Sequence, residues 1–256
     1  MSKPDPDVLV ESRLTDGVAV LTLADPDHRN ALSRQLSDDL AHAVGAALDD
    51  GARALVLGAA PPVFCAGGSL DALLARTDPL PEMFAGLTAL AGAPVPTVAA
   101  VAGPAIGAGV NLPLACDLVI ATPRARFDPR FLDVGIHPGG GHLFRLASRV
   151  GAQGAAAMVL CGDVLTGQEA VERGLAWRCV DESDLDRTAM ALARRAAARP
   201  ARLVRRTKET LHRSLTLNDP DAAFALELDA QEWSMDQPEF TEALARVRAR
   251  ITEARR

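Results

Sequence analysis

Residues 86–116 carry no charged side chain, although charged residues make up 23% of the chain. A run of this length could cross a membrane as a helix. However, Pro94, Pro96, Pro104 and Pro113 interrupt it, and a proline inside a helix removes a hydrogen bond and kinks the chain. The run therefore predicts a buried strand, loop and helix, and it argues against a membrane-spanning helix.

Apolar strands alternate with helical segments over the first three-quarters of the 256 residues. After Ser33, a good helix N-cap, apolar residues recur every four positions up to Gly51, which predicts a helix. This alternation is typical of an α/β core. Strands rich in Val, Leu and Ala are predicted at residues 17–24, 52–59, 96–103 and 116–122.

From Asp184 onward the pattern is entirely helical, with Pro238 at a favourable first helical position. We therefore divide the chain into a core, residues 1–195, and a helical region, residues 196–256. The helical region needs an apolar partner, either its own core or another subunit. Its large apolar residues include Phe224, Leu228, Trp233 and Phe240.

The formal net charge of −6 argues against a nucleic-acid-binding surface, which requires a basic face. Basic residues gather only at residues 194–213, either as a solvated helix face or as a contact for an anionic ligand or partner. The four cysteines form no C-x-x-C pair, and no signal peptide is evident at the acidic N-terminus. We expect a cytoplasmic protein with free thiols.

Three glycine turns precede apolar or helix-like segments, at residues 65–68, 107–109 and 139–141. Glycines before a helix leave backbone N–H groups free at its positive end, which suits an anion or oxyanion. They could also simply let helices pack closely. The glycine spacing fits neither the dinucleotide fingerprint nor a Walker motif, so a nucleotide loop is disfavoured.

Other polar residues near these turns predict no separate chemistry. Ser69 lies in a glycine turn without an evident base, so we expect it to cap the following helix. His137 and His142 flank the third turn at a spacing that does not suit metal ligation, and we expect ordinary hydrogen bonds for both. No metal site is predicted.

Five segments, in this order, resemble motifs of the enoyl-CoA hydratase/isomerase (crotonase) family: ADPDHRNALS, VFCAGGSLDAL, VAGPAIGAGVNLPLACDLVIAT, ARFDPRFLDVGIHPGGGHLFRL and LTGQEAVERGLAWRCV. The resemblance extends from about Gly17 into the C-terminal helices. It implies a crotonase-like spiral of β-β-α turns, with C-terminal helices that form a trimer contact, often within a dimer of trimers.

The resemblance also implies an acyl-CoA ligand, and no cofactor beyond its CoA moiety. Two backbone N–H groups, at Gly68 and Ala108, would hold the thioester oxygen as it becomes an enolate, a role that needs preorganised donors. Basic side chains would meet the CoA phosphates, among them Arg29, Arg205, Arg206 and Lys208. The positions implied for the CoA moiety are Arg29, Ala66, Gly67, Ser69 and Leu70.

The chain departs from the hydratase pattern at both catalytic carboxylates. Where hydratases of the family carry two glutamates, this sequence has Asn111 and Phe131. An amide can orient water but cannot exchange a proton, and a phenyl ring can do neither. Nearby, Asp128 and Asp133 are the alternative bases, unless they serve as surface or ion-pairing groups. Efficient hydration is therefore doubtful.

Several functions remain open from the sequence. The first is an enzyme of the hydratase/isomerase class, with decarboxylation or slow isomerisation favoured over hydration because a decarboxylating substrate generates its own enolate. The second is a catalytically silent protein that binds or senses acyl-CoA. A proteolytic relative is disfavoured because no Ser–Lys pair is apparent. Neither a nucleic acid nor a membrane is expected as a partner.

Overall fold

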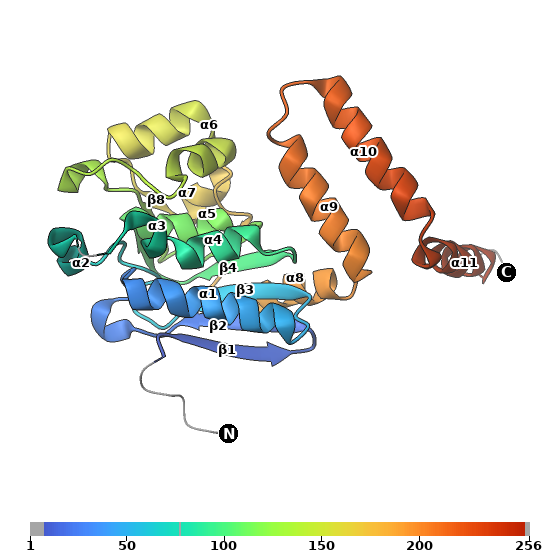
Figure 1. Cartoon of the computed structure of the whole chain (residues 1–256), viewed down its shortest axis with the longest axis horizontal. Helices are drawn as coiled ribbons and strands as arrows, with labels where there is room; N and C mark the ends of the chain where they lie inside the picture. The colour runs from blue at the N-terminus through green and yellow to red at the C-terminus, as the bar shows by residue number, and fades with distance from the viewer. Residues whose placement is uncertain (1–7, 77, 254–256) are drawn as a thin grey trace. The chain divides into compact units, whose positions relative to one another are not determined.

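The computed structural model describes residues 8–76 and 78–253, which fall into two compact units divided after Ala197 (Figure 1). The unit before this boundary is an α/β structure with a six-stranded and a three-stranded sheet among its described residues. The unit from Ala198 onward is helical wherever it has regular structure in the described part.

Each apolar segment predicted as a strand contains one, since β2, β3, β4 and β6 fall within the four expected ranges. The strands are β1 (Val10–Thr15), β2 (Val18–Leu23), β3 (Ala54–Ala59), β4 (Thr97–Val101), β5 (Pro104–Ile106), β6 (Leu118–Ala121), β7 (Arg126–Asp128), β8 (Leu165–Thr166) and β9 (Arg178–Cys179). The α-helices of this unit are α1 (Arg34–Asp49), α2 (Leu70–Ala75), α3 (Leu80–Met83), α4 (Ala85–Gly92), α5 (Asn111–Ala115), α6 (His142–Leu160), α7 (Gly167–Glu172) and α8 (Leu185–Ala197).

The large sheet has the order β1-β2-β3-β4-β6-β9. The edge strand β1 is antiparallel to β2, and every other neighbouring pair is parallel. Its central strands are apolar on both sides because helices cover both faces, as parallel sheets require.

Side chains on successive strand residues enter two separate apolar clusters. Leu55 and Leu57 of β3 join the cluster that includes α1 and α4, whereas Val56 between them joins the cluster of α8. This is the two-residue alternation of a β-strand. The sheet therefore lies between two apolar clusters, one on each face.

The small sheet, β5-β7-β8, continues from the large one, because β4 leads through a short turn into β5. Strand β7 is parallel to β5 and places Asp128 opposite Ile106. After β5 the chain forms a 3-10 helix, Gly107–Val110, which runs directly into α5. The second glycine turn thus lies at the junction of a strand and a buried helix.

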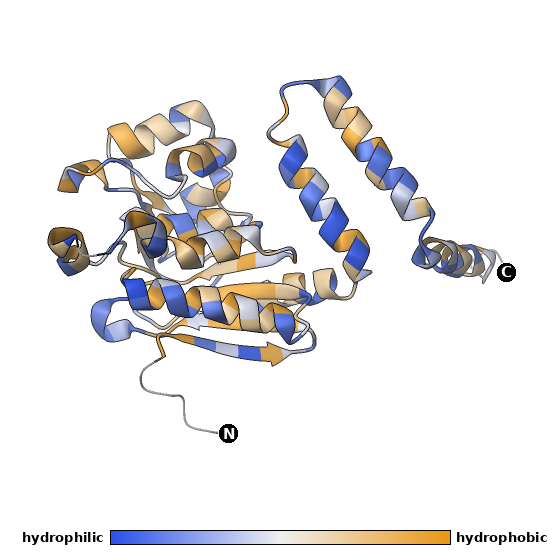
Figure 2. Cartoon of the chain, in the orientation of Figure 1, coloured by the Kyte–Doolittle hydropathy of each residue, from blue (hydrophilic) through white to orange (hydrophobic). Residues whose placement is uncertain are grey.

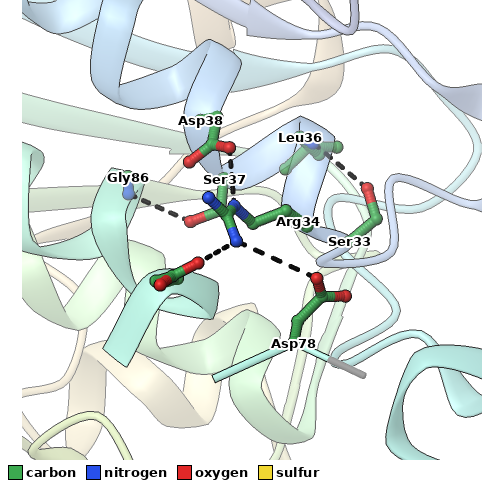
Figure 3. Close-up of polar contacts among 8 residues, drawn as sticks. Ser33, Arg34, Leu36, Ser37, Asp38, Asp78 and Gly86 are labelled. Atoms are coloured by element: carbon green, nitrogen blue, oxygen red, sulfur yellow. Dashed lines mark hydrogen bonds and ion pairs between the residues drawn. The ribbon is translucent and has the colours of Figure 1, made fainter. Parts of the chain in front are cut away.

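Helix α1 begins where the sequence predicts, since the Ser33 side chain accepts a hydrogen bond from the N–H of Leu36 at 3.1 Å. Figure 3 shows its first turn fastened to the segment before and within α4. Arg34 pairs with Asp38, Asp78 and Glu82, and the buried Ser37 hydroxyl accepts from the N–H of Gly86 at 3.0 Å.

The second unit contains α9 (Ala201–Ser214), α10 (Pro220–Met235) and α11 (Pro238–Glu253), and α11 begins at Pro238 as predicted. Within this unit, the guanidinium of Arg202 lies 5.6 Å from the centre of the Trp233 ring, and Arg206 pairs with Asp229. Hydrophilic residues predominate along α9 (Figure 2). Across the described part of the chain, no helix is both long and apolar enough to cross a membrane.

Candidate active site

The first glycine turn, residues 65–68, is built against the start of the second. Cys65 forms a parallel bridge with Ala105, and its carbonyl accepts from the N–H of Ile106 at 2.9 Å. Gly67 has a φ of +91°, and a Cβ added there would lie 2.7 Å from the Ile106 oxygen and 3.5 Å from the Ala108 nitrogen. Glycine is therefore required at position 67 for the two turns to meet.

The two predicted oxyanion positions adjoin this junction, since Gly68 follows Gly67 in sequence and the Ala108 nitrogen would lie 3.5 Å from a Cβ at Gly67. Leu32 bridges Gly68 through the flanking Gly67 oxygen and Ser69 nitrogen, so the N–H of Gly68 itself points away from Leu32. Ala108 lies in the first turn of the 3-10 helix, where N–H groups have no partner within the helix. Gly68 and Ala108 are both half-buried, and the contact of Gly67 with the Ile106–Ala108 backbone joins their two turns.

Close packing behind Ala108 is enforced by Gly109. A Cβ at this position would collide with the backbone oxygen of Cys65. Burial raises the pKa of the Cys65 thiol to about 12, so this sulfur is an inert packing group and not a nucleophile. The second turn is thus seated directly on the first.

Asn111 joins the second turn to the third. It is fully buried at the start of α5, and its Nδ2 donates to the carbonyl of Gly139 at 3.1 Å. Its Oδ1 lies 2.8 Å from Nδ1 of His142. Gly140, with a φ of +67°, packs so closely that an added Cβ would lie 3.0 Å from the Asn111 amide nitrogen. The amide therefore ties α5 to the loop before α6.

His142 is the residue for which the sequence predicted no more than an ordinary hydrogen bond. It is only 1% exposed at the first position of α6, and burial lowers its pKa to about 4. Its ring meets that of Phe131 edge to face, with 4.9 Å between ring centres. The expected ordinary hydrogen bond is present on Nδ1, but Nε2 is buried and has no hydrogen-bond partner among the described residues. A histidine directly after a glycine turn was the one available signal.

The two alternative carboxylates lie in different surroundings. Asp128 is buried at the end of β7 and forms an ion pair with the guanidinium of Arg130. The hydrogen bond to the Asp128 carboxylate raises the pKa of Arg130. Asp133 is exposed in the 3-10 helix Leu132–Val134. The ion-pairing alternative therefore describes Asp128. Among the described residues, neither carboxylate is hydrogen-bonded to Asn111 or His142.

The positions implied for CoA form one continuous strip on the first unit. The carbonyl of Arg29, in a left-handed conformation, accepts from the N–H of Ala66 at 3.1 Å. Ser69 caps α2, as predicted, by accepting from the N–H of Ala72 at 3.4 Å. Leu70 is 66% exposed. The strip thus presents backbone and an apolar side chain to the surroundings of Gly67.

Of the other basic residues expected near the CoA phosphates, Arg205, Arg206 and Lys208 lie on α9 of the second unit. Arg206 is already paired with Asp229. Among residues 8–76 and 78–253, no three His, Cys, Asp or Glu side chains form a group that could hold a metal ion.

The sequence matches the family model "Enoyl-CoA hydratase/isomerase" over residues 13–250. It is 40% identical over 244 residues to the probable enoyl-CoA hydratase EchA14 of Mycobacterium tuberculosis (strain H37Rv), covering 91% of this chain and 94% of that protein. It is 32% identical to the 1,2-epoxyphenylacetyl-CoA isomerase of Escherichia coli K12, covering 91% and 93%.

Solved structures of enoyl-CoA hydratases are similar to this one in fold. A crystal structure of an enoyl-CoA hydratase from Mycobacterium smegmatis matches with a TM-score of 0.86 and 30% sequence identity, covering 94% of this chain and 96% of that one. This likeness confirms the crotonase-like α/β fold expected from the motifs. The chain therefore belongs to the enoyl-CoA hydratase/isomerase family.

Proposed function

We propose that this protein is an enzyme that binds an acyl-CoA thioester and holds its carbonyl oxygen with the N–H groups of Gly68 and Ala108. The observation that carries the proposal is the contact of the two glycine turns, where Gly67 lies against Ile106 and Ala108. A backbone donor placed in this way stabilises a developing enolate oxygen by about 3–4 kcal/mol. The reaction needs no cofactor beyond the CoA moiety of the substrate.

Hydration by two carboxylates is not the reaction favoured here. The amide nitrogen of Asn111 donates to Gly139 and its oxygen accepts from His142, so the side chain acts as a structural link. A neutral amide does not act as an acid or a base at physiological pH. Phe131 adds an apolar wall. These features support isomerisation, in which one proton moves within the substrate, or decarboxylation, in which the breaking C–C bond supplies the enolate electrons.

Removal of one backbone donor tests the proposal. In Ala108→Pro the N–H is absent while a helical φ is retained, and proline is tolerated in the first turn of a helix. Ala108→Gly keeps the donor and is the matched control. Turnover is measured with crotonyl-CoA, 3-hexenoyl-CoA and methylmalonyl-CoA, which report hydration, isomerisation and decarboxylation. Calorimetry with butyryl-CoA measures binding.

We expect Ala108→Pro to lower turnover of the active substrate by roughly 10²- to 10³-fold, with Ala108→Gly near the parent value. Equal turnover by both variants would contradict the oxyanion assignment. Binding of butyryl-CoA without turnover of any thioester would identify a silent acyl-CoA-binding protein. Failure to bind any CoA thioester would overturn the proposal, and fast hydration of crotonyl-CoA would contradict the preference for isomerisation or decarboxylation.

A further inference from the structure

The hydrogen bonds of the described residues do not explain why Nε2 of His142 is buried. It is a ring nitrogen that finds no hydrogen-bond partner in residues 8–76 and 78–253, and its residue is 1% exposed. An unsatisfied buried polar atom costs on the order of 1–3 kcal/mol, and such atoms are rare in native proteins. A polar atom in this state calls for an explanation, and a partner that arrives with a bound substrate is one.

The hydrogen bonds around Asn111 determine which form of the ring is present. Its Nδ2 donates to the Gly139 carbonyl, which can only accept, so its Oδ1 faces His142. Oδ1 can only accept, and Nδ1 of His142 must therefore carry the hydrogen. In the neutral ring this leaves a lone pair on Nε2, and Asn111 is the positioning residue that fixes this tautomer.

His142 also lies between the two positions where the family resemblance led us to expect carboxylates. The hydrogen bond between its Nδ1 and Oδ1 of Asn111 orients the ring, and the same ring contacts the Phe131 ring. Asn111 follows Ala108 by three residues, about one helical turn. His142 is thus hydrogen-bonded to Asn111, one turn after Ala108, whose N–H would hold the thioester oxygen.

We propose that Nε2 of His142 is the proton acceptor of this site, in place of the two absent carboxylates. The inference rests on the proposed acyl-CoA function. In a 3-enoyl-CoA, the C2–H bond breaks, its proton binds Nε2, and its electron pair forms the enolate at the oxygen held by Gly68 and Ala108. The enolate then takes the same proton at C4, which moves the double bond to C2–C3 and restores the neutral ring.

The basicity of the ring suits this role. With a pKa of about 4, His142 is neutral at physiological pH and resembles a glutamate carboxylate, whose ordinary pKa is about 4.3. It therefore offers the basicity of the missing acids without placing a negative charge beside Phe131. Asp128, held by Arg130, is not available for the same task.

The test compares His142→Gln, which keeps a polar side chain but cannot carry a proton, with His42→Gln at an exposed position of α1. Isomerisation of 3-hexenoyl-CoA is followed by NMR, and calorimetry with butyryl-CoA reports binding. We expect a roughly 10²- to 10⁴-fold loss of kcat in His142→Gln, with butyryl-CoA affinity near the parent value. His42→Gln should match the parent in both.

A second measurement uses the parent protein in D2O and remains decisive if His142→Gln does not fold. Since Nε2 is shielded from water, part of the product should keep the substrate's own proton at C4. Complete deuteration at C4, parental turnover by His142→Gln, or butyryl-CoA binding without isomerisation would each overturn the inference while leaving acyl-CoA binding in place. No binding of butyryl-CoA by the parent protein would instead overturn the proposed function.

Discussion

At the scale of single residues, the buried neutral ring of His142 makes stability depend on pH. Its pKa is lowered by burial from 6.5 to about 4, so between these values the unfolded chain binds a proton that the folded chain does not. The neutral ring's contribution to the free energy of unfolding is complete above pH 6.5 and is lost as the pH falls. We expect this group alone to lower the free energy of unfolding by about 2 kcal/mol between pH 7 and pH 5.

Urea unfolding at these two pH values, in the parent and in His142→Gln, isolates this effect. The parent should lose more stability on acidification than the variant does. His28 supplies a control of opposite sign, because the hydrogen bond that its ring donates to the Asp25 carboxylate raises its pKa. His28→Gln should therefore increase the acid loss. The same pH dependence in the parent and in His142→Gln would contradict a buried neutral histidine.

The sequence predicted these individual residues unequally. Ser33 and Ser69 cap helices as expected, because capping depends on neighbours within three residues. The pair of Asn111 and His142 spans 31 residues and has no local signature. Asn111 is conspicuous in the sequence as an amide in an apolar run, and His142 as a histidine beside a glycine turn, but only the folded loop shows that the two side chains meet.

At the scale of elements, the first turn of α1 makes one buried hydrogen bond to α4 and several exposed ion pairs (Figure 3). Ser37 is 1% exposed and accepts from the N–H of Gly86, whereas the Arg34 side chain is 41% exposed among its carboxylates. We expect Ser37→Ala to destabilise by about 1–3 kcal/mol, because a buried N–H loses its partner.

Arg34→Ala loses three ion pairs yet should destabilise the protein less than Ser37→Ala does, since exposed ion pairs contribute little. Chemical unfolding of both variants measures the difference. Hydrogen exchange should show local opening of α3 in Arg34→Ala, because Glu82 lies in that helix. A larger global loss from Arg34→Ala than from Ser37→Ala would contradict this ranking.

The elements that the sequence predicted are those with a sustained period. The buried strands β3 and β4 and the amphipathic α1 each repeat an apolar pattern over at least five residues. The strands β5, β7 and β8 have two or three residues each, too few to show alternation. These are the strands that orient the Ala108 turn, so the fold class was predictable while the geometry of the site was not.

At the scale of the whole molecule, α11 presents an apolar stripe without a partner in the described part of its unit. Phe240, Leu244, Val247 and Ile251 follow one another at intervals of four, three and four residues, which places them on one face of the helix. Each is at least 40% exposed. A stripe of this kind is typical of a protein–protein interface.

We expect this stripe to be covered by other copies of the chain in a homotrimer or a dimer of trimers. Light scattering should then give about three or six times the chain mass of 26.9 kDa. Val247→Glu places a charge in the stripe and should shift the mass toward the monomer, because an unpaired charge is costly to bury. Ala249→Glu, exposed on the opposite face of α11, should keep the parent mass. A monomeric parent protein, or equal masses for the two variants and the parent, would show that the stripe has another role.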